Sequence, residues 1–162
     1  MKRISAACAA VAAIGLLASS AQAEISAEAA RASVAPFYKA LNAEFAKDSP
    51  ELIRQSTAPQ WISCRGNDIC VSRDEVLAGM GQRLKSVPDL KWEIKEILVS
   101  GNQVTVRGEA TGTPAGEFMG VPYTGKSLKL MSIDVHTLEG GKMVRTYHIE
   151  DWLGAVRQLS AK

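Results

Sequence analysis

The residues best suited to acid–base chemistry gather near the end of the chain, on either side of Gly140-Gly141. Two glycines between two stretches of alternating residues are a strong signal for a two-residue hairpin turn. If the pairing starts with Leu138 opposite Met143 and continues without interruption, alternate residues of both strands project from one face. That face would carry Leu130, Ser132, Asp134, His136, Arg145, Tyr147, Ile149 and Asp151.

This predicted face has two interpretations. It is either a solvated sheet face with cross-strand ion pairs, such as Asp134 with Arg145, or the wall of a pocket that contains polar groups. In a pocket, carboxylates and a histidine can move protons. The candidate catalytic residues are then Asp151, His136 and Asp134. The candidate substrate-binding residues are Tyr147, Ile149, Leu130 and Trp92. On the opposite face, His148 beside Glu150 is interpreted as a structural histidine.

Three helices are predicted in the first half of the chain, at 33–45, 49–58 and 72–87. Ser33 can cap the first helix, and Pro36 then falls in the first turn, where its missing N–H does no harm. Ser49-Pro50 is a cap-and-proline start for the second helix. Ser72 and Glu75 form a capping box at the start of the third helix.

After residue 88 the spacing of the apolar residues changes from a helical period to a period of two. The pattern then slips by one residue, which indicates a bulge near Lys95-Glu96. Strands are expected at 61–64, 90–99, 104–110, 126–139 and 142–152, with one or two helical turns at 153–159. Helices followed by an antiparallel sheet predict an α+β fold.

The N-terminus has the pattern of a secretory signal peptide. Lys2-Arg3 precedes an uncharged, mostly apolar run, and Ser19-Ser20-Ala21-Gln22-Ala23 offers a small-residue cleavage site. The run is about 15 residues long, short of the roughly 20 that a transmembrane helix needs. We expect cleavage after Ala23, a periplasmic or secreted location, and a single domain over residues 24–162.

Two cysteines, Cys64 and Cys70, flank the turn-prone Gly66-Asn67-Asp68. In an exported protein, cysteines this close together usually form a disulfide, and we predict that bond here. A metal site is the alternative. It would need further ligands, and the two histidines of the chain show no zinc-binding spacing relative to these cysteines. No metal is therefore expected.

The charge balance excludes one class of partner. Removing Lys2 and Arg3 leaves 17 basic residues (19 less 2) against 17 acidic ones. A near-neutral domain lacks the basic face that nucleic-acid binding requires. No second apolar run approaches the length of a membrane span, so no membrane contact is expected after cleavage.

The closing stretch of the chain resembles the SnoaL-like polyketide cyclase (ester cyclase) family of the nuclear transport factor 2-like superfamily. The residues that carry the resemblance are Phe118–Lys126, Asp134, Gly141-Lys142, Tyr147, Asp151 and Gln158-Leu159. In the family, Gln-Leu follows an aspartate by seven positions, and Asp151 and Gln158 keep that spacing. The match extends over most of the mature chain, and its specific part is about residues 116–159.

The resemblance implies a cone-like fold, in which a strongly curved antiparallel sheet and N-terminal helices enclose an apolar pocket. It also implies a cofactor-free intramolecular aldol condensation. An acidic residue removes a proton alpha to a carbonyl, and the enolate attacks a second carbonyl of the same molecule. The catalytic aspartate of the family carries over to Asp151. Asp134 and His136 would orient or polarise the carbonyl, and Tyr147 would donate a hydrogen bond to the oxyanion.

Two functions remain open at this point. One is an exported enzyme that transfers protons on a hydrophobic carbonyl or ester substrate, and the other is a periplasmic binding protein that uses the same pocket without turnover. The chain departs from the family at Pro114, near which many members have a histidine, and in the Cys64 region, where a polar residue is common. The expected partners are a small hydrophobic molecule and, through an exposed sheet face, a second copy of the chain.

Overall fold

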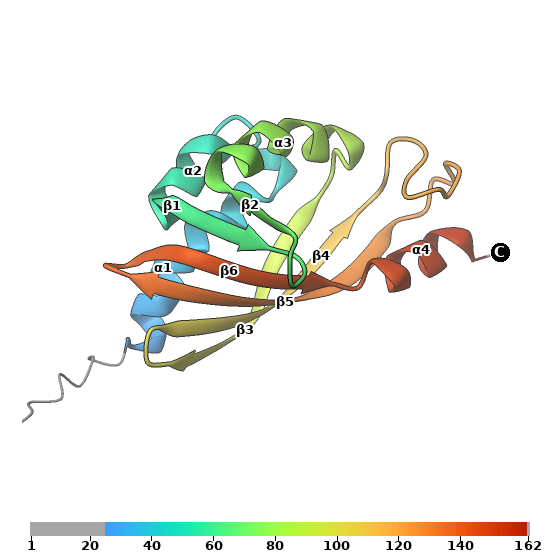
Figure 1. The fold of residues 1–162 in the computed structure, drawn as a ribbon. Coiled ribbons are helices and arrows are strands. Elements are labelled where there is room, and N and C mark those ends of the chain that lie inside the picture. Colours follow the sequence, from blue (N-terminus) through green and yellow to red (C-terminus); the bar gives the residue numbers. More distant parts are fainter. Residues whose placement is uncertain (1–24, 162) are drawn as a thin grey trace, which may run out of the picture.

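The computed structural model describes residues 25–161, which form helices on one side of a curved, open sheet (Figure 1). The helices are α1 Ala27–Ala40, the 3-10 helix η1 Ala43–Phe45, α2 Ser49–Ser56, α3 Arg73–Ser86 and α4 Trp152–Ser160. The strands are β1 Thr57–Cys64, β2 Cys70–Ser72, β3 Lys91–Ser100, β4 Gln103–Gly112, β5 Leu128–Glu139 and β6 Lys142–Glu150. The predicted α+β fold is confirmed. The predicted signal peptide and its cleavage site lie outside the described residues.

The six strands follow the order β2-β1-β6-β5-β4-β3. Neighbouring strands are antiparallel, except that β1 runs parallel to β6. Helix α1 packs against β3, helix α3 packs against β1, and α4 continues from the end of β6 and contacts β5 (Figure 1). The inner face of the sheet therefore lies under α1 and α3, and alternate residues of each strand point into the space between the layers.

The first helix begins earlier than the sequence predicted. Ser26, rather than Ser33, is the N-cap, and its hydroxyl accepts a hydrogen bond from the Ala29 N–H at 3.1 Å. The alanine-rich segment that follows has high helix propensity, which extends the helix upstream. Pro36 consequently lies inside α1, and the carbonyl that loses its partner belongs to Ala32, which is exposed and open to water.

The second helix and the first strand also differ from the prediction. Helix α2 ends at Ser56, and β1 begins at Thr57, so Pro59 lies within a strand. A strand proline is tolerated where no ladder bond is needed, and the pairing of β1 with β6 is interrupted between Thr57 and Ile62. The short strand β2 was not predicted. It pairs with the end of β1 and places Cys70 directly opposite Cys64.

Two bulges shape the sheet. The predicted bulge near Lys95 is confirmed, since the pairing of β3 with β4 shifts between Ile94 and Glu96. The second bulge was not predicted. Leu138 pairs with Met143 as expected, but Thr137 pairs with Arg145, so that Val144 is an extra residue on β6. A one-residue slip moves every later side chain to the other face, and the uninterrupted register predicted for this hairpin is therefore wrong.

Candidate functional site

A cavity of about 500 Å³ lies between α1, α3 and the inner face of the sheet. Its wall combines aromatic and aliphatic side chains with about as many polar and charged ones. The lining residues are Phe37, Leu41, Trp61, Ser63, Arg65, Val71, Glu75, Val76, Gly79, Met80, Arg83, Trp92, Asp134, Thr146, His148, Glu150 and Trp152. A concave cavity in which polar groups converge between apolar walls is typical of a small-molecule site.

Asp134 is the buried carboxylate of this cavity. It lies on β5, where alternate residues face the helices, and only 5% of it is exposed. Its Oδ2 oxygen accepts hydrogen bonds from the Tyr38 hydroxyl at 2.9 Å and from the Ser132 hydroxyl at 3.0 Å. Among the described residues, donors reach only Oδ2, so the second carboxylate oxygen, Oδ1, is available to a ligand in the cavity.

His136 lies behind Asp134 in a chain of buried hydrogen bonds. Its Nε2 is 3.0 Å from the Tyr38 hydroxyl oxygen, and its Nδ1 is 2.9 Å from the Thr146 hydroxyl oxygen. The Tyr38 hydroxyl has one hydrogen, which it donates to Asp134. Its oxygen therefore accepts a hydrogen bond from His136, and the ring hydrogen of His136 is on Nε2. Thr146 then donates to Nδ1 and accepts from the Trp61 indole N–H at 2.9 Å. Every donor in the chain points toward Asp134.

Burial changes the acidity of both groups. It raises the pKa of Asp134 to about 6, with a further contribution from the nearby Glu150 carboxylate, while the bonds from Tyr38 and Ser132 and the charge of Arg83 oppose the rise. Burial also lowers the pKa of His136 to about 3, assisted by His148. Near neutral pH the imidazole is therefore uncharged, as the hydrogen-bond chain requires, and the carboxylate titrates in the range that suits a general base.

A second polar group lies on β6 beside Asp134. Glu150 accepts a hydrogen bond from the Arg83 guanidinium at 3.1 Å and another from the Trp152 indole N–H at 2.8 Å. His148 pairs directly with Asp134 across the two strands. Burial lowers the pKa of His148, and so do the charges of Arg83 and Arg65. The Glu150 carboxylate has the opposite effect. The cavity thus holds two carboxyl groups of different kinds. Glu150 is ion-paired with Arg83, and Asp134 has a pKa near neutrality.

The predicted face is brought together only in part. Asp134 and His136 lie on the inner face of the sheet, as expected. Tyr147 and Ile149 lie on the outer face, 49% and 66% exposed, because the bulge at Val144 reverses the alternation of β6. The prediction that Tyr147 and Ile149 line the pocket is therefore wrong, and Thr146, His148 and Glu150 take the inward positions in their place.

Asp151 does not line the cavity either. It is exposed and forms the N-cap of α4, where its Oδ1 accepts a hydrogen bond from the Gly154 N–H at 2.8 Å. The placement predicted for Asp151 is corrected for two reasons. The bulge shifts the register, and β6 ends at Glu150, directly before Asp151, so that the carboxylate serves the helix that begins there.

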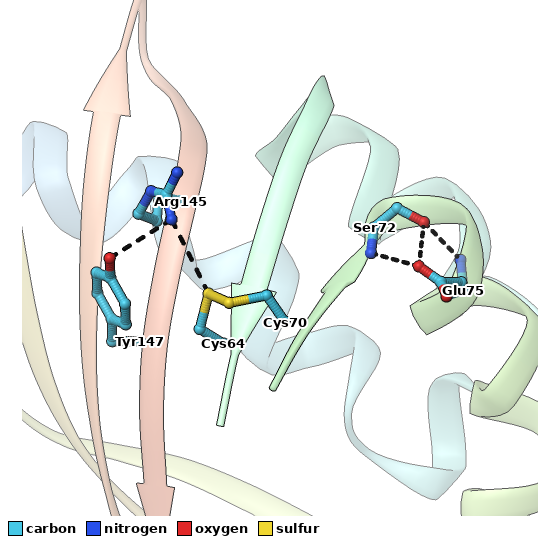
Figure 2. Close-up of a disulfide and its surroundings, with 6 residues drawn as sticks. All are labelled: Cys64, Cys70, Ser72, Glu75, Arg145 and Tyr147. Atoms are coloured by element: carbon cyan, nitrogen blue, oxygen red, sulfur yellow. Dashed lines mark hydrogen bonds between the residues drawn. A yellow bond between two sulfur atoms is a disulfide. The ribbon is translucent and has the colours of Figure 1, made fainter. Parts of the chain in front are cut away.

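The predicted disulfide between Cys64 and Cys70 is confirmed (Figure 2). It joins β1 to β2, the strand that leads directly into α3. On the outer face, Arg145 lies between the Tyr147 hydroxyl and the Cys64 sulfur and donates toward both (Figure 2). Arg145 therefore does not pair with Asp134, and the interpretation of a solvated face joined by that ion pair is wrong.

Leu130 and Trp92 are both buried, and both border a second, smaller cavity of about 210 Å³. Trp92 lies on the wall of both cavities. No group of three or more His, Cys, Asp or Glu side chains with the arrangement of a metal site occurs in residues 25–161. Within the same residues, no helix is long and apolar enough to cross a membrane.

Sequence reasoning missed several polar residues of the site. They are Tyr38, Trp61, Arg83, Thr146, His148 and Glu150. Tyr38, Trp61 and Arg83 come from α1, β1 and α3, and no local pattern connects them with β5. The other three lie on β6 beyond the bulge, and the hint in the sequence was His148 beside Glu150 at alternate positions.

The fold resembles that of several solved structures. One is a candidate SnoaL-like polyketide cyclase from Jannaschia sp. CCS1, with 20% identity, a TM-score of 0.71, and coverage of 83% of this chain and 94% of that one. Another is IdmH, a candidate polyketide cyclase from Streptomyces antibioticus, with 24% identity, a TM-score of 0.71, and coverage of 82% and 99%. AclR, a candidate hydroxylase from Streptomyces galilaeus, has 25% identity, a TM-score of 0.69, and coverage of 85% and 84%.

No curated protein matches the chain in sequence. The structural neighbours include both candidate cyclases and a candidate hydroxylase, so the shared fold does not by itself fix the reaction. A family model gives the more specific result. The model of the SnoaL-like polyketide cyclases matches residues 34–159, which span α1 to α4 and every residue of the cavity wall. The chain belongs to the SnoaL-like polyketide cyclase family.

Proposed function

We propose that the protein is an exported, cofactor-free enzyme that transfers a proton on a hydrophobic carbonyl compound, with Asp134 as the acid–base group. One observation carries the proposal. A buried carboxylate lines a cavity of mixed polar and apolar walls, has both of its protein donors on one oxygen, and has its pKa raised to about 6 by burial. Such a group accepts and returns protons near neutral pH.

In the proposed step, the free Oδ1 of Asp134 takes a proton from the carbon next to the carbonyl of the substrate. The C–H electron pair moves into the carbonyl group and gives an enolate, while Asp134 becomes a neutral acid. The enolate then follows one of two routes. If it is conjugated with a C=C bond, Asp134 returns the proton to a more distant carbon and the double bond shifts; otherwise the enolate carbon attacks a second carbonyl carbon of the same molecule. In the second case a C–C bond forms, and Asp134 returns its proton to the new alkoxide.

His136 acts in this scheme as a positioning residue rather than a catalytic one. It is fully buried and bonded at both ring nitrogens, so it contacts Tyr38 and Thr146 and not the substrate. Its neutral ring donates to Tyr38, which holds the Tyr38 proton on Oδ2 of Asp134. That arrangement keeps the carboxylate in one orientation, with Oδ1 toward the cavity.

Proton exchange tests the proposal without knowledge of the natural substrate. A ketone with one acidic methylene, such as 1-tetralone, is incubated with the protein in D₂O, and loss of the alpha-proton signal is followed by NMR. We expect catalysed exchange that rises with pH around a midpoint near 6, because the ionised form of Asp134 is the base. Asp134→Asn should reduce the rate by roughly two to four orders of magnitude.

The matched control is Asp151→Asn, which changes the aspartate outside the cavity and should leave exchange intact. If the ketone binds but the wild-type protein does not exchange its protons, catalysis by Asp134 is rejected. The same conclusion follows if Asp151→Asn, and not Asp134→Asn, abolishes exchange.

A binding protein is the second candidate. It is favoured by the contacts of the other polar groups. Glu150 is ion-paired with Arg83, and both ring nitrogens of His136 are hydrogen-bonded within the protein, so neither group is free to transfer a proton. Asp134 is then a hydrogen-bonding group for the ligand. In that case a bound molecule should be recovered unchanged, and Asp134→Asn should weaken its affinity.

The proposed export is supported by the signal-peptide pattern at the N-terminus. The signal-peptide pattern ends at Ala23, and the disulfide between Cys64 and Cys70 fits an oxidising compartment. We expect mass spectrometry of the protein from its native host to show an N-terminus at Glu24. Protein that retains Met1 to Ala23 in bulk would contradict export.

We also propose that two copies associate through the outer face of the sheet. Apolar side chains of β5 and β6 are exposed there, and no helix within residues 25–161 covers them. They are Met131, Ile133, Tyr147 and Ile149. Paired strands place Ile133 directly opposite Ile149, so the apolar residues are contiguous. Contiguous exposed apolar surface is typical of an interaction site, and a two-fold axis would bury the same patch from both copies.

A further inference from the structure

The smaller cavity is a separate apolar chamber. It has a volume of about 210 Å³ and lies between the end of α3, strands β4 and β5, and the tight turn Phe118–Val121. In that turn Met119 and Gly120 both have positive φ, and Phe118 and Val121 exchange two backbone hydrogen bonds of 2.9 Å. Most other lining side chains are aliphatic. They are Val87, Leu90, Ala110, Leu128 and Leu130.

The chamber and the larger cavity are neighbours, because three side chains line both of them. They are Arg83, Trp92 and Trp152. Glu150 connects two of them, since it accepts from Arg83 at 3.1 Å and from the Trp152 indole at 2.8 Å. The Arg83 guanidinium carbon also lies 6.0 Å from the centre of the Trp92 ring. The apolar chamber therefore adjoins the charged part of the proposed active site.

Trp92 is one of these shared residues and is tightly packed. It is 6% exposed, and the Cε3–Cζ3 edge of its ring faces Gly108 on β4, where an added Cβ would lie 3.6 Å away. Its indole N–H is buried and has no acceptor among residues 25–161, so the ring borders the two cavities with its carbon atoms.

We propose that the substrate spans both cavities. Its reactive carbonyl end lies in the larger cavity beside Asp134, and an apolar arm fills the smaller chamber. The inference rests on the proposed function of the larger cavity. It narrows the substrate class to carbonyl compounds that carry one apolar arm of limited length.

The size of the chamber limits the arm. An apolar cavity of about 150 Å³ in another protein accommodates benzene, so about 210 Å³ corresponds to roughly eight carbon atoms at similar packing. A single substituted ring or an alkyl chain of this length fits. A longer chain would have to leave the chamber and would gain nothing further from it.

A series of unbranched methyl ketones, from 2-pentanone to 2-dodecanone, tests this inference. Binding can be followed by intrinsic fluorescence, because all three tryptophans of the chain line the larger cavity. Each added methylene should improve affinity by roughly threefold to fourfold until the chamber is full, after which affinity should stay level.

Leu130→Ala enlarges the chamber and should move that limit to longer chains by two or three carbons. Its matched control is Leu138→Ala, an equal truncation of a buried leucine on the same strand that lines neither cavity. The control should leave the limit where it is.

The outcomes separate the two proposals. Affinity that is independent of chain length, or a limit that moves equally in Leu130→Ala and Leu138→Ala, would overturn the chamber while leaving exchange by Asp134 untouched. If no ketone of any length binds and no exchange occurs, both the chamber and the proposed function are wrong.

Discussion

The raised pKa of Asp134 results from the burial of its carboxyl group. The carboxylate is buried, and two hydroxyl donors and the nearby Arg83 only partly compensate for the loss of water. The result is a pKa raised from 3.8 to about 6. A carboxylate on the protein surface would not hold its proton near neutral pH. The burial on which the proposed role of Asp134 depends must therefore cost stability when the carboxyl group ionises.

The pH dependence of stability follows from that shift. The folded protein holds the Asp134 proton more tightly than the unfolded chain, so ionisation destabilises the fold as pH rises from about 4 to above 6. Asp134→Asn removes this cost, which is on the order of 3 kcal/mol. Relative to the wild type, the unfolding free energy of the variant should thus increase between pH 4 and pH 8, measured by urea denaturation.

Val106→Ala is the control for this prediction. Val106 is buried directly opposite Asp134 on β4 and carries no titrating group. Its effect on the unfolding free energy should be the same at every pH. A difference between wild type and Asp134→Asn that does not change with pH would show that Asp134 is not the buried titrating group described here.

At the level of elements, one inserted residue decides which side chains meet. The extra Val144 in β6 turns Thr146, His148 and Glu150 inward and turns Tyr147 and Ile149 outward. The end of β6 decides the role of Asp151, which becomes the cap of α4 instead of a member of the cavity. The bulge depends on how β6 pairs with β5, and the end of β6 depends on how the strand meets α4. Neither can be recognised from the alternation of polar and apolar residues in the sequence.

The cap assigns Asp151 a structural effect. Asp151→Ala should lower the unfolding free energy by about 1 kcal/mol with little change in proton exchange, whereas Asp151→Ser keeps an acceptor and should retain most of the stability. Gly154→Ala should act like Asp151→Ala, because an added Cβ would clash with the Asp151 carboxylate. Loss of exchange at unchanged stability in Asp151→Ala would contradict this assignment.

The disulfide holds the β1–β2 hairpin from which α3 starts. Replacing both Cys64 and Cys70 by alanine should lower the unfolding free energy by roughly 2 kcal/mol, as expected for a short closed loop. Thiol counting on unfolded, unreduced protein should find neither cysteine free. Two free thiols, or equal stability of the double variant, would contradict a disulfide in the native protein.

At the level of the whole molecule, the two faces of the sheet differ in kind. Helices cover the inner face and leave a cavity, while the outer face of β5 and β6 exposes the apolar patch of Met131, Ile133, Tyr147 and Ile149. The cavity and the patch are separated by the thickness of one sheet, so their functions can be tested independently.

The proposed dimer gives the corresponding test. Ile149→Arg places a charge in the centre of the patch and should convert a dimer to a monomer in sedimentation or light scattering, with proton exchange retained. Ile69→Arg changes a similarly exposed isoleucine in the loop after β1 and should leave the dimer intact. A wild-type protein that is monomeric at high concentration would reject the proposal.

The sequence by itself determined the elements and one strand of the site. Alternation along β5 placed Asp134, His136 and Leu130 on one face, which the structure shows to be the buried one, and the slip in the apolar pattern located the bulge of β3. These features are local, because side-chain direction in a strand follows from chain geometry alone. The spacing of Cys64 and Cys70 was likewise sufficient to predict their bond.

Only the tertiary structure decided which residues complete the site. Tyr38, Arg83 and Thr146 reach Asp134, Glu150 and His136 from separate elements, and their contacts depend on how α1, α3 and β6 pack. The bulge in β6 is invisible to alternation, because the residues on both sides of Val144 mix polar and apolar types in either phase. The face they take is set by burial against the helices, and burial is a property of the packed molecule.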